Sequence, residues 1–323
     1  MKNPHNLSIK NLFLWGYDLF NHNPRALSIF VTNRCNSKCK TCYIWKKKPK
    51  VDLPVETIKE ILNDPITRRC DFTLQGGEFF LHPEYKEILT LFKNRKFNVF
   101  SNALCKEKLI EAVNKHKIQN LYLSLDGKLD TNKSIRGVNN YNQVIEIINK
   151  LKNKAAITVN HTISPWNTFE DLIHVKNLCE KNKVRLQLGI YSNFRFFNTQ
   201  HKINKIDKRI VANISEEYIR KCNSWFDGKI HFPCNSLRIW GTIYPNGDVP
   251  LCPNKDIILG NINACKLSDI WKSEKSKNIR KKYYSCNGCW NPCSRRMEIE
   301  LVSIAKNKIP KYFLKSYQQL FEL

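Results

Sequence analysis

The chain has 323 residues, 42% of them hydrophobic, which is enough to bury one large core and a smaller second one. It contains no run of about 20 apolar residues, which excludes a membrane-spanning helix of the usual kind. The net charge of +26 comes from basic residues, mostly lysines, that are spread over the whole chain. We therefore expect no nucleic-acid-binding groove, although this charge would steer an acidic substrate or partner toward the surface.

The 13 cysteines are expected to be reduced thiols in a cytoplasmic protein rather than disulfide partners. The polar start of the chain, Met1–Asn6, gives no sign of a secretory signal peptide. Cys70, Cys105 and Cys179 occur singly inside predicted helices and strands, where thiols pack as small hydrophobic groups.

From residue 26 onward, short β-rich runs alternate with amphipathic segments of helical length. Strands are predicted at 26–32, 71–75, 97–101, 120–125, 155–163 and 184–190. Helices are predicted between them at 53–63, 84–95, 105–116, 140–152 and 168–182. This order predicts a parallel sheet with right-handed crossovers, and six such units fall short of the eight in a closed barrel. We therefore expect an α/β fold built on a partial, open (β/α)6 TIM-like barrel.

The remaining residues divide around this barrel core. The predicted units are an N-terminal amphipathic segment (1–26), the core (27–193), a lysine-rich linker with one helix near 215–226 (194–232), a small cysteine-rich hairpin domain (233–295) and a C-terminal helix (296–323). Both ends carry aromatic residues beside lysines. We expect them to pack on the protein, with weak contact to a membrane surface as the second interpretation.

Three cysteines follow the first predicted strand within eight residues. Cys35, Cys39 and Cys42 can wrap a loop around one small inorganic centre, and the next cysteine, Cys70, lies 28 residues downstream. Three thiolate ligands to a cubane iron–sulfur cluster leave one of its irons open for chemistry. The alternative from these residues alone is a zinc site with a distant fourth ligand, because structural zinc closes all four positions.

A glycine pair and a carboxylate end the second predicted strand. Gly76 and Gly77 let backbone approach a ligand closely at the carboxyl end of a parallel strand, and Glu78 can accept hydrogen bonds from an ammonium group.

Together these segments resemble the radical S-adenosylmethionine (SAM) enzymes. Cys35–Cys42 match the family's C-x3-C-x2-C, and Gly76–Glu78 match its motif for the SAM amino group. Ser124–Gly127 resembles the S-x-D-G segment near the ribose and methionine of SAM, through Ser124 and Asp126. Ile135–Gly137 resembles the segment whose arginine, here Arg136, contacts the SAM carboxylate.

The sequence departs from the family's motifs at two places, which affect contacts near SAM but not the identity of the cofactor. Phe79 stands where the family usually has proline, and Ser101–Ala103 replaces a common Thr-Asn-Gly, keeping Asn102 as a SAM-site residue. His161, inside the fifth predicted strand, is interpreted as a packed or surface histidine rather than a substrate ligand.

The resemblance implies a [4Fe–4S] cluster on Cys35, Cys39 and Cys42 whose open iron binds SAM. A reductant such as ferredoxin or flavodoxin would supply the electron that cleaves SAM to a 5′-deoxyadenosyl radical. That radical abstracts hydrogen from a substrate, while the protein orients the substrate and excludes water.

A second group of cysteines lies toward the end of the chain. Asn246–Gly247 is a hairpin signal that would bring Cys234 and Cys252 together, and a C-x2-C-x3-C run follows at 286–293. This segment resembles the SPASM/twitch extension of radical SAM enzymes, which holds an auxiliary [4Fe–4S] cluster. The favoured ligands are Cys234, Cys252, Cys286 and Cys289, with Cys293 competing for one position. A zinc ribbon is the alternative, and Cys222 and Cys265 are expected to be free thiols.

The resemblance favours oxidation or cross-linking of a peptide or protein, as in ribosomal natural products. About 25 residues precede the first strand, too few for a leader-binding domain, so a peptide would need a separate recognition protein or the basic surface itself. A radical SAM dehydrogenase or decarboxylase acting on a sugar or tetrapyrrole is the alternative. A non-catalytic metal-bound scaffold that binds nucleic acid is more remote, because it has no use for Gly76–Glu78 or Arg136. The sequence assigns no catalytic acid or base.

Overall fold

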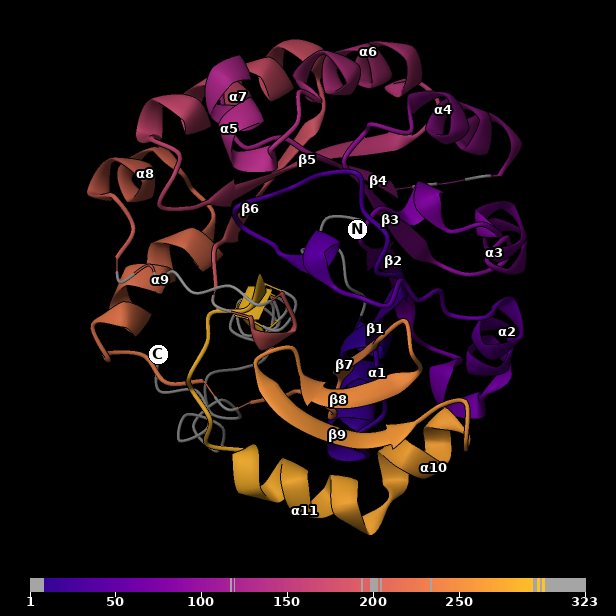
Figure 1. Cartoon of the computed structure of the whole chain (residues 1–323). Helices are drawn as coiled ribbons and strands as arrows, with labels where there is room; N and C mark the ends of the chain where they lie inside the picture. Colours follow the sequence, from indigo (N-terminus) through magenta and orange to yellow (C-terminus); the bar gives the residue numbers. More distant parts are fainter. Residues whose placement is uncertain are drawn as a thin grey trace.

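The computed structural model describes residues 9–116, 118, 120–192, 194–197, 203, 205–232, 234–292, 295, 296, 298 and 299. A seven-stranded sheet, with every neighbouring pair parallel, runs in the order β6-β5-β4-β3-β2-β1-β7. Its strands are β1 (Ala26–Thr32), β2 (Asp71–Gly76), β3 (Phe97–Ser101), β4 (Asn120–Ser124), β5 (Ala156–Ile163), β6 (Arg185–Ile190) and β7 (Trp240–Ile243). The sheet curls into an open barrel, as predicted (Figure 1).

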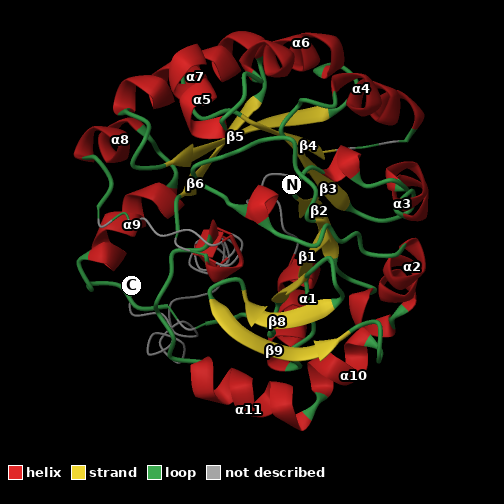
Figure 2. Cartoon of the chain, viewed as in Figure 1, coloured by secondary structure: helices red, strands yellow, loops and turns green. Residues whose placement is uncertain are grey.

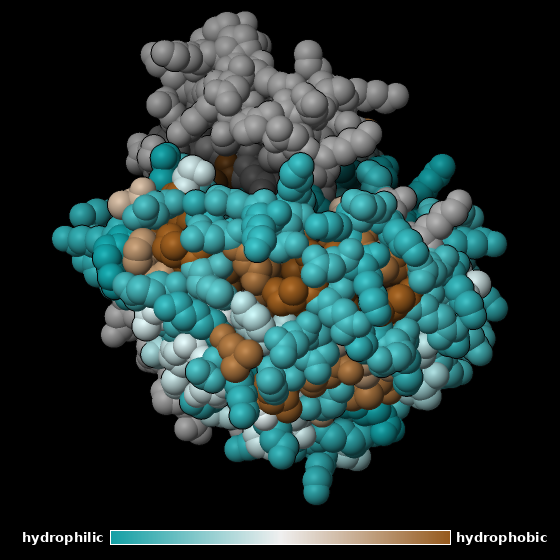
Figure 3. Space-filling view, turned by 90° about the horizontal axis from the view of Figure 1, so that it is seen from above, coloured by the Kyte–Doolittle hydropathy of each residue, from teal (hydrophilic) through white to brown (hydrophobic). Residues whose placement is uncertain are grey.

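Helices cover the convex side of this sheet (Figure 2). They are α2 (Val55–Asn63), α3 (Tyr85–Leu91), α4 (Lys106–Lys115), α5 (Leu129–Arg136), α6 (Tyr141–Leu151) and α7 (Phe169–Asn182). Successive side chains of a strand point to opposite faces of the sheet. In β1, Leu27, Ile29 and Val31 therefore join the large core, whereas Phe30 belongs to a separate cluster. Figure 3 shows part of the outside of this helical layer, where hydrophilic side chains predominate and hydrophobic ones are visible between them.

The strands and helices predicted for the barrel core are present, and the main differences are additions. Helix α5 was not predicted; it is short and polar, and it ends where Gly137 adopts a left-handed conformation with φ of 66°. Helix α7 begins with a capping box between Thr168 and Asp171.

The seventh strand changes the interpretation of the C-terminal hairpin. The turn at Asn246–Gly247 exists, with the N–H of Tyr244 donating to the carbonyl of Asp248 at 2.9 Å. However, β7 before this turn pairs in parallel with β1, and the antiparallel hairpin is formed by β8 (Asp248–Cys252) and β9 (Lys255–Asn261). The prediction of six sheet strands was therefore one short, because β7 is contributed from far along the chain.

The C-terminal unit packs directly on the barrel. Helices α10 (Leu267–Lys272) and α11 (Glu274–Tyr283) follow the hairpin, and Trp271 of α10 belongs to the main hydrophobic core. A Cβ on Gly241 would lie 2.7 Å from the Trp271 ring, so β7 and α10 approach closely only because this residue is glycine. The indole N–H of Trp271 also donates to the carbonyl of His22 at 2.6 Å.

The stretch expected to be a linker with one helix contains two, α8 (Lys208–Asn213) and α9 (Glu217–Phe226). A second core joins Ile210, Tyr218 and Ile219 of these helices to Leu188 of β6 and to Trp290. The helices lie beside β6 at the open side of the sheet (Figure 1). The domain limits themselves stay predictions.

The N-terminal segment contributes α1 (Ile9–Phe20), on which Phe20 is 83% exposed. The predicted C-terminal helix lies almost wholly outside the described residues. Among the described helices, none has the length and apolar character that crossing a membrane requires.

Candidate functional site

The three cysteines Cys35, Cys39 and Cys42 lie on the loop after β1, and the end of β2 holds the start of this loop. The N–H of Gly77 donates to the carbonyl of Thr32, and that of Glu78 donates to Arg34, both at 2.8 Å. A Cβ on Gly77 would lie 1.9 Å from the Arg34 carbonyl oxygen, so a side chain has no room there. The glycine pair was predicted to admit a ligand. Its close neighbour in the structure is the protein's own cysteine loop.

Helix α5 holds the middle of the same loop. The N–H groups of Lys38 and Lys40 donate to the carbonyls of Arg136 at 2.9 Å and Ile135 at 2.8 Å. A Cβ on Gly137 would lie 2.7 Å from the Lys38 carbonyl oxygen. The Ile135–Gly137 segment therefore supports the cysteine loop through its backbone.

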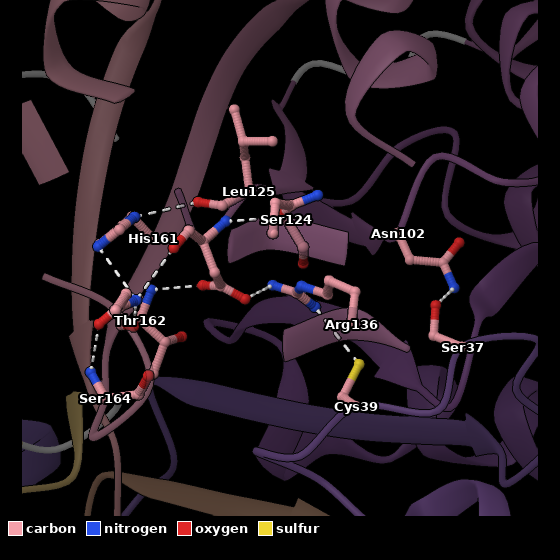
Figure 4. Close-up of polar contacts among 12 residues, drawn as sticks. Ser37, Cys39, Asn102, Ser124, Leu125, Arg136, His161, Thr162 and Ser164 are labelled. Atoms are coloured by element: carbon pink, nitrogen blue, oxygen red, sulfur yellow. Dashed lines mark hydrogen bonds and ion pairs between the residues drawn. The ribbon is translucent and has the colours of Figure 1, made fainter. Parts of the chain in front are cut away.

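Asn102, just beyond β3, supplies a third attachment. Its side-chain amide donates to Asn36 Oδ1 and Ser37 Oγ, each at 2.8 Å (Figure 4 shows the bond to Ser37). Its own Oδ1 accepts the N–H of Leu104 at 3.0 Å. Asn102 is thus already engaged with protein groups, which makes it a support of the loop.

Glu78 is buried, with 1% of its surface exposed, and accepts hydrogen bonds from protein donors. Its Oε1 accepts from Ser101 Oγ at 2.9 Å and from the N–H of Phe80 at 3.3 Å, and its Oε2 accepts from the N–H of Asn102 at 2.7 Å. Burial raises the pKa of this carboxyl to about 7, against the lowering effect of these donors. Among the described residues, Oε1 accepts two of these bonds and Oε2 accepts one, so Oε2 has the greater capacity for a further donor. Phe79, the departure from the family pattern, is fully buried in the main core.

Arg136 connects the cysteine loop to the end of β4. Its Nη2 forms an ion pair with Asp126 Oδ2 at 2.6 Å, and its Nη1 lies 3.9 Å from Cys39 Sγ. Its Nε is buried and has no hydrogen-bond partner among the residues that the structure describes. Asp126 Oδ1 accepts the N–H of Thr162 at 2.9 Å, so this carboxylate positions Arg136 against β5 (Figure 4).

Buried asparagines that were not singled out in the sequence join the strand ends. Asn132 Oδ1 accepts the N–H of Asp126 at 2.9 Å, and its amide donates to Asn140 Oδ1 at 2.7 Å. Asn140 in turn donates to the carbonyls of Asn102 at 2.7 Å and Ser124 at 3.2 Å. The sequence signal was weak, because asparagine is abundant throughout this chain.

His161 is fully buried among protein groups, in agreement with a packed histidine. Its Nδ1 lies 3.2 Å from the carbonyl of Leu125, and because a carbonyl only accepts, Nδ1 carries the proton. Burial lowers the pKa of this imidazole, which favours its neutral form.

The thiols of the loop form one electrostatic group. The pKa of Cys35 is raised to about 12, mainly by burial; a charge on Cys39 contributes to this increase, and Arg136 opposes it. Burial likewise raises the pKa of Cys39 and Cys42, and Cys42 responds to charge on both of the others. All cysteines in the described part of the chain are free. Three soft sulfur donors beside a buried cation fit a thiolate-bound iron–sulfur cluster, whose negative charge Arg136 would offset.

The second group of thiols comes together from three segments. Cys234 precedes β7, Cys252 ends β8, and Cys286 and Cys289 follow α11. Charge on Cys286 or Cys289 raises the pKa of Cys234, and charge on Cys234 or Cys289 raises that of Cys252, although burial is the main cause for both. The predicted competitor, Cys293, lies outside the described residues.

The two remaining predicted free thiols are placed differently. Cys222 is buried in the second core, where burial alone raises its pKa. Cys265 is exposed, with its Sγ 3.7 Å from the carbonyl of Asn261.

Two family models match this chain in the order in which the thiol groups occur. The model of the radical SAM superfamily matches residues 29–179, and that of the SPASM iron–sulfur cluster-binding domain matches residues 234–290. Together they span more than half of the chain. The chain belongs to the radical SAM superfamily. It carries a SPASM domain at its C-terminal side, and these two family models imply SAM and [4Fe–4S] clusters, including an auxiliary one, as its cofactors.

One relative of this radical SAM chain matches part of its sequence, and solved structures match its fold. Sporulation killing factor maturation protein SkfB of Bacillus subtilis is 31% identical over 124 residues, which cover 35% of this chain and 29% of SkfB. This chain therefore aligns with less than a third of that relative. SuiB of Streptococcus suis bound to precursor peptide SuiA superimposes with a TM-score of 0.68 at 19% identity, covering 87% of this chain and 74% of SuiB. Native anSMEcpe with bound AdoMet gives a TM-score of 0.60 at 16% identity, covering 88% and 98% of the two chains.

Proposed function

We propose that this radical SAM enzyme modifies a peptide or protein, with the auxiliary cluster aiding oxidation. The observation that carries the proposal is the cysteine loop itself, which is bonded to β2, to the end of β3 and to α5, with Arg136 against Cys39. A loop fixed by that many backbone and side-chain bonds suits a site that must hold reacting atoms within fractions of an ångström.

Cys35, Cys39 and Cys42 would hold the cluster that binds SAM. The bound cluster supplies the electron that cleaves the sulfur–C5′ bond and so starts radical chemistry. Gly76, Gly77 and Glu78 would line the site of the SAM amino group, and Glu78 Oε2 would accept a hydrogen bond from that group. The Nε–H of Arg136, which has no partner among the described residues, would donate a hydrogen bond to the SAM carboxylate.

Three predicted SAM contacts act indirectly in this proposal. The side chain of Asn102 bonds to the cysteine loop, and the side chain of Asp126 bonds to Arg136 and to β5. Ser124 offers its carbonyl to Asn140 at 3.2 Å. We assign them the task of shaping the SAM site.

The concave side of the sheet favours a peptide substrate. Gln75, Phe100, Tyr122 and Asn160 lie on strand positions opposite to those that fill the main core, and the rings of Phe100 and Tyr122 stack at 4.4 Å. Carboxamides beside an aromatic pair suit a chain that offers amide groups and side chains together. The named relatives agree: SkfB is a maturation protein, SuiB was determined with precursor peptide SuiA, and anSMEcpe with a Cp18Cys peptide.

Charge on the cysteine loop points to an acidic segment in that peptide. Residues 34–50 contain seven basic residues and no acidic one. The ion pair between Arg34 and Asp52, at 2.8 Å, offsets one of these charges. Such a surface speeds the approach of acidic partners, and this effect weakens with salt.

Cys234, Cys252, Cys286 and Cys289 would hold the auxiliary cluster, and a ferredoxin or flavodoxin in the cytoplasm would supply electrons. The test begins with anaerobic loading of the full chain with iron and sulfide, followed by SAM and dithionite. We expect about eight irons per chain, as two four-iron clusters require, and formation of 5′-deoxyadenosine.

Peptides encoded by short reading frames beside the gene are then supplied, and mass spectrometry follows the loss of hydrogen from them. Replacing Cys35, Cys39 and Cys42 together with alanine should abolish deoxyadenosine formation. The matched control Cys70→Ala, a buried cysteine outside both groups, should keep it. Deoxyadenosine without any peptide product, together with turnover of a sugar or tetrapyrrole, would contradict the peptide assignment.

A further inference from the structure

One short helical turn contacts both thiol groups. It is η5 (Arg195–Phe197), within the stretch that the sequence presented as a linker. The N–H of Tyr43, the residue after Cys42, donates to the carbonyl of Phe197 at 2.9 Å. The N–H of Phe196 donates to the carbonyl of Pro253, the residue after Cys252, at 3.2 Å. The cysteine loop and the β8–β9 hairpin are therefore bonded to adjacent residues of the same turn.

Aromatic rings fill the space around this turn. Phe196 stacks on Tyr244 with 3.9 Å between centroids and 14° between planes, and Phe30 meets Phe196 edge-on at 5.1 Å. Phe30 and Tyr244 are buried, and the side chains of Cys35 and Cys42 pack against this cluster. A charge on Cys252 raises the pKa of the Tyr244 phenol, after burial as the main cause, so the tyrosine also lies within electrostatic reach of the other thiol group.

Charged side chains attach the turn on each side. The Lys47 ammonium, from the cysteine loop, lies 4.4 Å from the centroid of the Phe196 ring. Arg195 forms an ion pair with Asp256 of β9. The contacts to the loop and to the hairpin thus converge on residues 195–197, and Phe196 takes part in both sets.

We propose that η5, through the Phe196 ring, is a positioning element that couples the SAM-cluster loop to the auxiliary-cluster hairpin. Ordering of one thiol group restricts the motion of the other, because both are bonded to a turn too short to deform independently at its two sides. The proposal rests on the assignment, under the proposed function, of the two thiol groups to two clusters. It predicts that ordering one thiol group slows the motion of the other, which would not occur if the two sites folded independently.

The first experiment measures hydrogen exchange by mass spectrometry on the full chain before cluster loading. Phe196→Ala should raise exchange in the segments 42–47 and 252–256 alike, by about tenfold, because both lose their common support. Phe196→Tyr keeps a ring and should stay close to the parent chain. Tyr141→Ala, which removes an aromatic ring on the outer helix α6, should leave both segments unchanged. Faster exchange in only one segment, or in neither, overturns the proposal.

The second experiment loads only the auxiliary site, in a chain whose Cys35, Cys39 and Cys42 are alanine. With Phe196 present, binding of about four irons should slow exchange in segment 42–47, far along the chain from the loaded cysteines. With Phe196→Ala this distant protection should disappear although the iron content stays the same. Protection that survives in the Ala variant, or that is missing in its parent, overturns the coupling. If no iron binds, the ligand assignment fails, and the first experiment still decides whether the turn joins the two segments.

Discussion

Arg136 and Cys39 lie 97 positions apart in the chain, yet the guanidinium Nη1 is 3.9 Å from the thiol sulfur. The same guanidinium pairs with Asp126 through Nη2, at 2.6 Å. A buried positive charge therefore stands beside the thiols before any cluster is bound. It favours the thiolate form that a cluster requires, while burial of Cys39 opposes that form by raising its pKa.

The first prediction concerns the close approach of β2 to the cysteine loop. Gly77→Ala should destabilise the chain by several kcal/mol and reduce iron binding, because its Cβ would lie 1.9 Å from the Arg34 carbonyl oxygen, which is backbone and cannot turn aside. Gly16→Ala is the matched control, since no atom lies within 4 Å of its added Cβ and it sits inside α1. Alanine there should be neutral or stabilising by up to ~1 kcal/mol. Urea unfolding and iron content after anaerobic loading measure both variants; equal stability of the two would contradict the steric explanation.

The second prediction concerns the side chain of Asn102. Asn102→Ala removes both donors to Asn36 and Ser37 and should loosen the cysteine loop, at about 1–2 kcal/mol for the lost buried bonds. We expect faster trypsin cleavage after Lys38 and Lys40, and a cluster that loses iron sooner in air. Asn98→Ala on β3 is the control, because Asn98 lies within the strand rather than at its end. Unchanged cleavage and iron retention in Asn102→Ala would show that the loop does not depend on these bonds.

The sequence was sufficient for the parts of this fold that depend on local pattern. The alternation in β1 to β6 and the motif spacing predicted the open barrel and placed Cys35, Gly76 and Arg136 at one end of it. Strand β7 could not be predicted in the sheet, because its partner β1 lies more than 200 residues earlier and nothing local distinguishes a sheet strand from a hairpin strand.

The roles of the motif residues could be predicted from the sequence less well than their positions. Asp126 and Asn102 match family segments, but only the structure shows that their side chains bond to Arg136, Thr162 and the cysteine loop. The turn at 195–197 carries no motif. Its contacts depend on tertiary packing, which a lysine-rich segment without periodicity does not reveal.

The third prediction is a pH dependence caused by Glu78. Burial raises the pKa of this carboxyl from 4.5 to about 7 in the folded chain, so the folded state binds its proton more tightly than the unfolded state does. The free energy of unfolding of the cluster-free, SAM-free chain should therefore be highest below pH 4.5, as far as this group is concerned. It should fall as the pH rises toward 7, by up to ~3 kcal/mol.

Glu78→Gln provides the comparison, because its neutral side chain has the same shape and does not titrate. The difference in unfolding free energy between the two proteins should change with pH between 4.5 and 7 and level off above that range. Urea titrations at several pH values measure this difference. A difference that is constant with pH, or that favours Glu78 as pH rises, would contradict the assignment.

The last prediction separates the structural from the SAM-binding role of Arg136. Arg136→Gln leaves the buried Asp126 carboxylate without its ion pair and should cost about 3–5 kcal/mol of stability. Adding Asp126→Asn removes the stranded charge, so the double variant should be more stable than the sum of the two single changes by at least about 1 kcal/mol. Additive single effects would show that the pair is not coupled.

Arg136→Lys keeps a positive charge but lacks the buried Nε. This variant should weaken SAM binding by about tenfold, measured by calorimetry on the anaerobically loaded chain. Unaltered SAM affinity in Arg136→Lys would remove Nε from the SAM site and leave Arg136 with its support of Cys39 and Asp126 alone.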